Sequence, residues 1–161
     1  MRAIAYGAVV WAAFIWAFST GSATANDRYV GYYYPEHGPR EVYKARAETL
    51  SQADREMRIG FVTGIMNQQF QNPYPPQVAM FAKGDEARKL IIVSLVDGRL
   101  DTVFRARGVF ANLTASSRLL PLFAEMGVQT YFTFFDLAKM LGFKQITISN
   151  GRDFAHQVVL E

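Results

Sequence analysis

The C-terminal segment FKQITISNGRDFAHQVVLE (residues 143–161) constrains the fold more than any other part of the chain. Asn150-Gly151 is a strong signal for a β-hairpin, because both residues readily adopt the backbone angles of tight turns. A three-residue loop, 149–151, places one apolar set on a common face: Ile146, Ile148, Phe154, His156, Val158 and Leu160. A slip of one residue would turn that set toward solvent. We therefore expect an antiparallel pair with a three-residue loop.

A second hairpin is predicted upstream, where residues 78–82 and 89–96 flank the charged turn KGDE (83–86). The stretch LIIVSLV (90–96) is rich in β-branched residues and apolar at nearly every position. That pattern is typical of a central strand buried on both sides.

Helices are expected at residues 52–70, 101–118 and 133–141, with a short helical piece after Pro121, because apolar residues recur there at helical spacing. Ser51 is the expected N-cap of the first helix, Thr133 and Asp136 form a capping pair, and Gly142 follows the last helix. The order predicts an α+β fold. We expect an antiparallel sheet of about four strands, made of two hairpins, with three or so helices packed on one side.

The first 25 residues have the three parts of a secretory signal peptide. Arg2 is the only charge before Asp27, residues 3–18 are apolar or glycine, and Ala23-Thr24-Ala25 fits a cleavage site. We expect export to the periplasm by the general secretion route, because no twin arginine precedes the apolar run. The domains are then a signal peptide (1–25), an extended tyrosine-rich arm (26–50) and a single α+β domain (51–161). The chain would contact a membrane only if residues 1–25 were retained as an anchor.

Composition excludes several chemistries. The chain has no cysteine, which rules out disulfides, thiolate metal sites and cysteine nucleophiles. Its 13 Phe and 8 Tyr supply a core instead. The net charge of +3 and the thin cationic clusters do not indicate nucleic-acid binding. With two histidines, no metal site is expected, and no motif indicates a cofactor.

His156 is the first candidate for catalysis. Asp153 and Arg152 are near it in the sequence, and a His–Asp pair can orient an imidazole as a general base. The sequence places no nucleophile beside them. The alternative is a histidine at the edge of the core that bonds to the backbone.

Aromatic residues in loops are the candidates for binding. Tyr33, Tyr34 and His37 lie in the arm, and Tyr74 lies in NPYPP (72–76). Exposed rings of this kind can stack on a sugar or dock a proline-rich segment. Alternatively, the tyrosines of the arm anchor it on the domain's surface.

The stretches GYYYPE (31–36), NPYPP (72–76), YFTFFDLAKMLGF (131–143) and ITISNGRDFAHQV (146–158) resemble a family of small exported alphaproteobacterial proteins. That family is often labelled "molybdopterin-guanine dinucleotide biosynthesis protein A". The nucleotide loop L-A-G-G-x-S-x-R-M-G, which is typical of the nucleotidyltransferases of that name, is absent from this sequence.

The sequence thus favours an exported, non-enzymatic binding or assembly protein whose partner is an envelope protein or a cell-wall component. Two alternatives remain. One is a protein related to molybdopterin-guanine dinucleotide biosynthesis, which the resemblance implies. The other is a small periplasmic hydrolase that uses His156 and Asp153.

Overall fold

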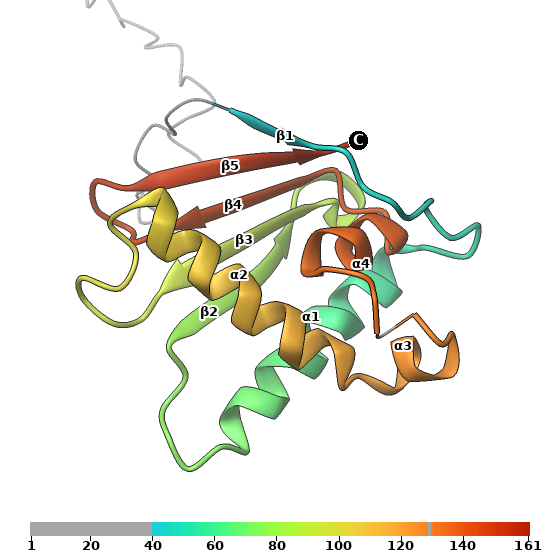
Figure 1. Ribbon diagram of the computed structural model, residues 1–161, viewed down its shortest axis with the longest axis horizontal. Helices are drawn as coiled ribbons and strands as arrows, with labels where there is room; N and C mark the ends of the chain where they lie inside the picture. Colours follow the sequence, from blue (N-terminus) through green and yellow to red (C-terminus); the bar gives the residue numbers. More distant parts are fainter. Residues whose placement is uncertain (1–39, 129) are drawn as a thin grey trace, which may run out of the picture. The chain divides into compact units, whose positions relative to one another are not determined.

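The computed structural model describes residues 40–128 and 130–161, which form an α+β domain (Figure 1). The strands are β1 (Glu41–Tyr43), β2 (Val78–Lys83), β3 (Lys89–Ser94), β4 (Gln145–Ser149) and β5 (Ala155–Leu160). The helices are α1 (Arg55–Phe70), α2 (Val103–Arg118), α3 (Pro121–Glu125) and α4 (Phe134–Met140), and a 3₁₀ turn, η2 (Asp85–Ala87), joins β2 to β3.

The five described strands form one mixed sheet in the order β1-β5-β4-β3-β2. Both predicted hairpins are confirmed, since β2–β3 and β4–β5 are antiparallel. The expectation of an entirely antiparallel, four-stranded sheet is wrong. β3 pairs with β4 in parallel, because the chain crosses from one hairpin to the other through α2, α3 and α4. The fifth strand, β1, lies within the expected arm and pairs in parallel with β5.

The C-terminal hairpin has the predicted faces but a longer loop. Ile146 pairs with Val158 and Ile148 with His156, so these side chains share the buried face. The loop runs from Asn150 to Phe154 rather than 149–151, because the Asn150 side chain accepts hydrogen bonds from three successive backbone N–H groups. The observed and predicted registers differ by an even number of residues, so the faces are unchanged.

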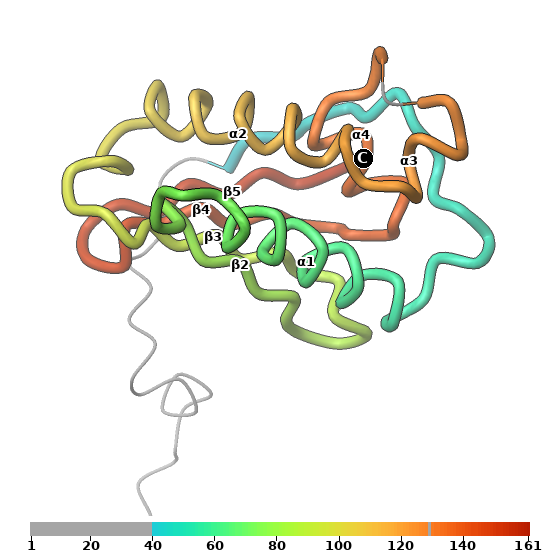
Figure 2. The backbone as a smooth tube through the Cα atoms, turned by 90° about the horizontal axis from the view of Figure 1, so that it is seen from below, coloured from blue at the N-terminus to red at the C-terminus, as the bar shows by residue number. Residues whose placement is uncertain are grey.

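One face of the sheet is buried beneath the helices. Its side chains are Val78, Met80, Leu90, Ile92, Ile146, Ile148, His156, Val158 and Leu160. Figure 2 shows α2 as a separate layer on one side of the strands. The residues that alternate with this set, such as Ile91 and Val93, are only half-buried. The prediction that 90–96 is buried on both sides is therefore wrong.

Phenylalanine rings fill the space between sheet and helices, as the composition indicates. The ring of Phe61 in α1 lies 5.9 Å from that of Phe123 and 6.0 Å from those of Phe134 and Phe143, measured between centroids. These four residues are at most 3% exposed. Contacts between aromatic rings stabilise the core beyond the burial of apolar surface alone. They do so in a chain that has no cysteine to form disulfides.

Side-chain caps set where the helices begin. Asp54, not the predicted Ser51, caps α1, since its carboxylate accepts from the N–H of Met57 at 2.7 Å. Thr133 and Asp136 form the predicted capping box of α4. Each cap satisfies N–H groups that the first helical turn leaves without partners.

Gly142 follows α4 in the predicted left-handed conformation, with φ +80°. A β-carbon there would lie 2.9 Å from Nη1 of Arg58 and 3.3 Å from Cγ2 of Thr49. Gly142 therefore lets the buried guanidinium of Arg58 lie against the backbone at this turn.

We expect Gly142→Ala to lower the free energy of unfolding by about 1–3 kcal/mol, because it adds both backbone strain and a steric overlap. Chemical denaturation checks this. The matched control is Gly60→Ala in α1, where a β-carbon meets nothing within 4 Å. That change is expected to stabilise by about 0.5–1 kcal/mol. Equal effects at the two sites would contradict the role of Gly142.

Candidate functional site

The candidate residues from the sequence fall in different places. Tyr33, Tyr34 and His37 lie outside the described residues. His156 lies on β5, facing the helices, and is 7% exposed. Tyr74 lies in the loop between α1 and β2 and is 77% exposed.

The imidazole of His156 is paired with Glu41. Its Nε2 lies 2.8 Å from Oε2 of Glu41 on β1, and Arg107 of α2 approaches the other carboxylate oxygen at 3.7 Å. Glu41 carries no signal in the sequence, because a strand of three residues gives almost no periodic pattern. The contact joins the short strand β1 to β5 and to α2.

Asp153 and Arg152 have other partners. Asp153 accepts from Asn150 Nδ2 at 2.7 Å in the exposed hairpin loop, and Arg152 pairs with Asp97 at 2.9 Å. Among the described residues no hydroxyl group hydrogen-bonds to His156. A carboxylate-held imidazole has the form of a general base, but this one is buried and serves to tie two strands together.

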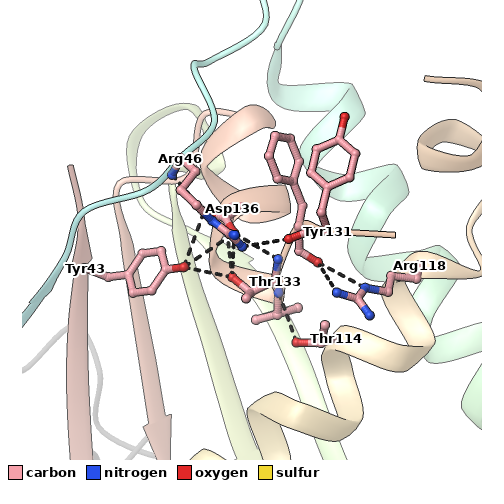
Figure 3. A network of polar contacts seen from close by, with 9 residues as sticks. Tyr43, Arg46, Thr114, Arg118, Tyr131, Thr133 and Asp136 are labelled. Atoms are coloured by element: carbon pink, nitrogen blue, oxygen red, sulfur yellow. Dashed lines mark hydrogen bonds and ion pairs between the residues drawn. The ribbon is translucent and has the colours of Figure 1, made fainter. Parts of the chain in front are cut away.

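Asp136 is the centre of the polar network in Figure 3, and it is fully buried. The backbone N–H and Nη2 of Arg46 both donate to it at 2.8 Å, and the N–H and hydroxyl of Thr133 both donate at 2.9 Å. The Tyr43 hydroxyl adds a contact at 3.3 Å. Nη2 of Arg46 also donates to the carbonyl of Tyr131 at 2.7 Å.

The same network extends to α2. The Thr114 hydroxyl accepts from the N–H of Phe134 at 3.0 Å, and Arg118 donates to the carbonyl of Phe132 at 2.9 Å. Both oxygens of Asp136 are already occupied by donors of the protein. The network therefore fixes the end of β1 and the helices α2 and α4 against each other, and it leaves no acceptor for a ligand.

Burial alone would raise the pKa of Asp136. The hydrogen bonds from the N–H groups of Thr133 and Arg46, and then from their side chains, outweigh burial and hold that pKa below its ordinary value. A carboxyl group with a lowered pKa stabilises the fold above its unfolded-state pKa, near 4, and this stabilisation is lost as the pH falls through the folded-state pKa.

We expect Asp136→Asn to lower the free energy of unfolding at pH 7 by about 3 kcal/mol, because it leaves the buried donors without a charged acceptor. The difference from the unmodified protein should shrink as the pH falls from 5 to 2. Melting curves across this range measure it. Asp153→Asn in the exposed loop is the control, with a small difference at every pH. If the difference in the free energy of unfolding between Asp136→Asn and the unmodified protein stays constant down to pH 2, the electrostatic account is wrong.

Tyr74 borders a cleft of about 250 Å³ between the end of α1, the 72–77 loop and α2. The lining residues are Gln69, Asn72, Tyr74, Pro75, Pro76, Gln77, Val78, Arg99, Val109, Asn112, Leu113 and Ser116. We call this the Tyr74 cleft. It combines an exposed ring and two prolines with the side-chain amides of four residues, so it offers both apolar contact and neutral hydrogen-bonding groups.

A wider and more open hollow of about 910 Å³ adjoins it along α2. It is bordered by Val96 and by Phe104, whose side chain is 85% exposed. Arg99, Val109 and Asn112 line both spaces. The two hollows therefore adjoin at these residues, and we call them together the Tyr74 groove.

Arg99 is the charged residue that both parts of the Tyr74 groove share. It is half-buried. Within residues 40–128 and 130–161, no carboxylate lies within ion-pair distance of it, whereas the neighbouring Arg105 and Arg107 are paired with Asp101 and Glu41. Arg99 thus presents donors for an anionic group of a ligand. Arg99 could not be predicted from the sequence, because a lone arginine after a turn belongs to no pattern.

In the described part of the chain, no three His, Asp or Glu side chains come together in a way that could hold a metal ion. None of the described helices has the length and apolar character needed to cross a bilayer. Comparison of the chain with models of known protein families, with curated proteins and with solved structures finds no match.

Proposed function

We propose that the chain is an exported, non-enzymatic binding or assembly protein that holds an extended segment of a partner protein in the Tyr74 groove. The observation that carries this proposal is the half-buried Arg99, without an ion-pair partner among the described residues, at the junction of two adjoining hollows. Export is inferred from residues 1–25, which lie outside the described residues.

The chemistry of the groove indicates what the segment carries. An acidic side chain would pair with Arg99, and apolar side chains on either side would pack on Tyr74 and Phe104. The amides of Asn72 and Asn112 would bond to the backbone of the segment. Tyrosine and arginine are the residue types that most often dominate the free energy of binding at interfaces, and a charge-assisted pair at Arg99 would fix the register of the segment.

Binding is favoured over catalysis by how the ionisable groups are used. His156 and Asp136 are both engaged in contacts that join strands and helices. Three of the apolar side chains that the fold leaves exposed, Tyr74, Val96 and Phe104, line the Tyr74 groove instead. An envelope protein is therefore the expected partner, in agreement with the expectation of export.

Selection from a displayed library of random ten-residue peptides tests the proposal. We expect the selected peptides to carry an acidic residue next to aromatic or aliphatic residues. Tyr74→Ala and Arg99→Gln should each weaken their binding by about tenfold or more, measured by calorimetry, with melting temperatures changed by no more than about 2 °C.

Two matched variants serve as controls. Tyr131→Ala removes an exposed tyrosine elsewhere on the domain, and Arg55→Gln removes an exposed arginine at the other end of α1. Both variants should bind the selected peptides with an affinity within twofold of that of the unmodified protein. Peptides that lack acidic residues, or that bind the Arg99→Gln protein as tightly as the unmodified one, would overturn the proposed site. The accurate mass of the protein isolated from the cell tests removal of residues 1–25 separately.

A further inference from the structure

Four cationic side chains from four separate segments line one small cleft at the end of the sheet where β3 and β4 begin. They are Arg58 of α1, Arg88 just before β3, Lys139 of α4 and Lys144 just before β4. The cleft has a volume of about 160 Å³, and none of the described residues that line it is acidic. We call it the cationic cleft.

Arg58 forms the buried wall of the cationic cleft and is 2% exposed. Its Nε donates to the carbonyl of Glu86 at 2.7 Å, and its Nη1 donates to the carbonyl of Leu141 at 3.0 Å. The carboxylate of Glu86, which is largely exposed, lies 3.9 Å from Nη2. These contacts hold the guanidinium in place, and the carboxylates of Glu86 and Asp54 offset part of the effect that burial and Arg88 have on its pKa.

The remaining cations are less engaged. Lys139 Nζ donates to the carbonyl of Leu160 at 3.3 Å. For the side chains of Arg88 and Lys144, no described residue supplies a hydrogen bond or an ion pair. Burial lowers the pKa of Arg58, and the positive charge of Arg88 lowers it further. The protein thus gathers like charges that repel one another, an arrangement that a bound anion would stabilise.

The cationic cleft opens toward a wider hollow of about 570 Å³. Arg88, Lys139 and Lys144 line both spaces. The wider hollow adds Arg40 and Lys89 together with Asp85 and Glu161, so its additional charges offset one another. The excess of positive charge comes from the three cations that line both spaces. A ligand can therefore place one compact anionic group in the cationic cleft and extend its remainder into the wider hollow.

We propose that the cationic cleft binds a doubly charged phosphate group, either free or as the terminal monoester of a larger molecule. Several donors approach from different elements, which suits a tetrahedral group with three or four acceptor oxygens better than a planar carboxylate. Arg58 also caps the carbonyls at the end of α4, and that structural role would explain Arg58 alone. It does not explain Arg88 and Lys144, so the test uses these two residues.

Titration of the purified protein with inorganic phosphate, in a chloride buffer of constant ionic strength, tests the proposal. We expect saturable binding, with NMR shifts centred on the amides of Gly142 and Lys144. Arg88→Gln and Lys144→Gln should each weaken binding by at least about fivefold, and the double variant by at least about thirtyfold. The control is Arg152→Gln, which removes one positive charge at the opposite end of β4 and should change affinity by less than twofold.

Melting temperature without phosphate gives an independent readout. If the cations are gathered for a ligand, Arg88→Gln and Lys144→Gln relieve repulsion and raise the melting temperature in chloride, by about 1–4 °C. Phosphate should then raise it less than in the unmodified protein. A fall in melting temperature for both variants would assign the residues a structural role and overturn the proposal. Phosphate binding that Arg152→Gln weakens equally would overturn it as well.

Two further titrations distinguish the sources of the phosphate group. Saturable binding of glycerol phosphate that depends on Arg88 and Lys144 supports a soluble monoester. Binding to phosphatidylcholine vesicles that contain phosphatidic acid, with the same dependence and with competition by inorganic phosphate, supports a lipid headgroup. Absence of saturable binding in all three titrations would overturn the proposal.

Discussion

The parallel pairing of β3 with β4 is the constraint on which the rest of the structure depends. It joins two separate hairpins into one sheet with a single apolar face, on which the helices pack. It also aligns the starts of the two strands, where the N–H of Lys144 donates to the carbonyl of Arg88 at 2.9 Å. The cationic cleft is thus a direct product of the strand order, because the same register that buries Ile92 beside Ile148 brings two cations together at the edge.

Two polar contacts extend this sheet to a strand that could not form alone. β1 has three residues, which is the lower end of the usual strand length. Glu41 holds it to His156 at one end, and Tyr43 holds it to the Asp136 network at the other. The buried His156 and Asp136 thus hold β1 in place, and the exposed aromatic rings and the half-buried Arg99 remain for recognition.

The features of the fold that depend on residues close together in the chain could be predicted from the sequence. The capping box of Thr133 and Asp136, the turn at Gly142 and the inward face of β4–β5 depend on residues close together in the chain, and they are confirmed. The β3–β4 pairing and the strand β1 depend on contacts between distant segments, for which one sequence carries no pattern. The cationic cleft was hidden for the same reason, since its residues are spread from 58 to 144 and the net charge is only +3. Of the binding residues that were predicted from the sequence, Tyr74 lines the Tyr74 groove. Arg99 was not among them, because no sequence pattern marks it.

The order of the strands has a consequence for when the protein can fold. Among the described strands, β1, the first, pairs with β5, the last, so the backbone of Glu41 has no partner among them until Val158 has been synthesised. A chain still emerging from the ribosome lacks this partner and leaves that edge of the sheet unfinished. Such long-range closure slows folding. The β1 edge of the sheet is therefore completed only after the last described strand has been synthesised.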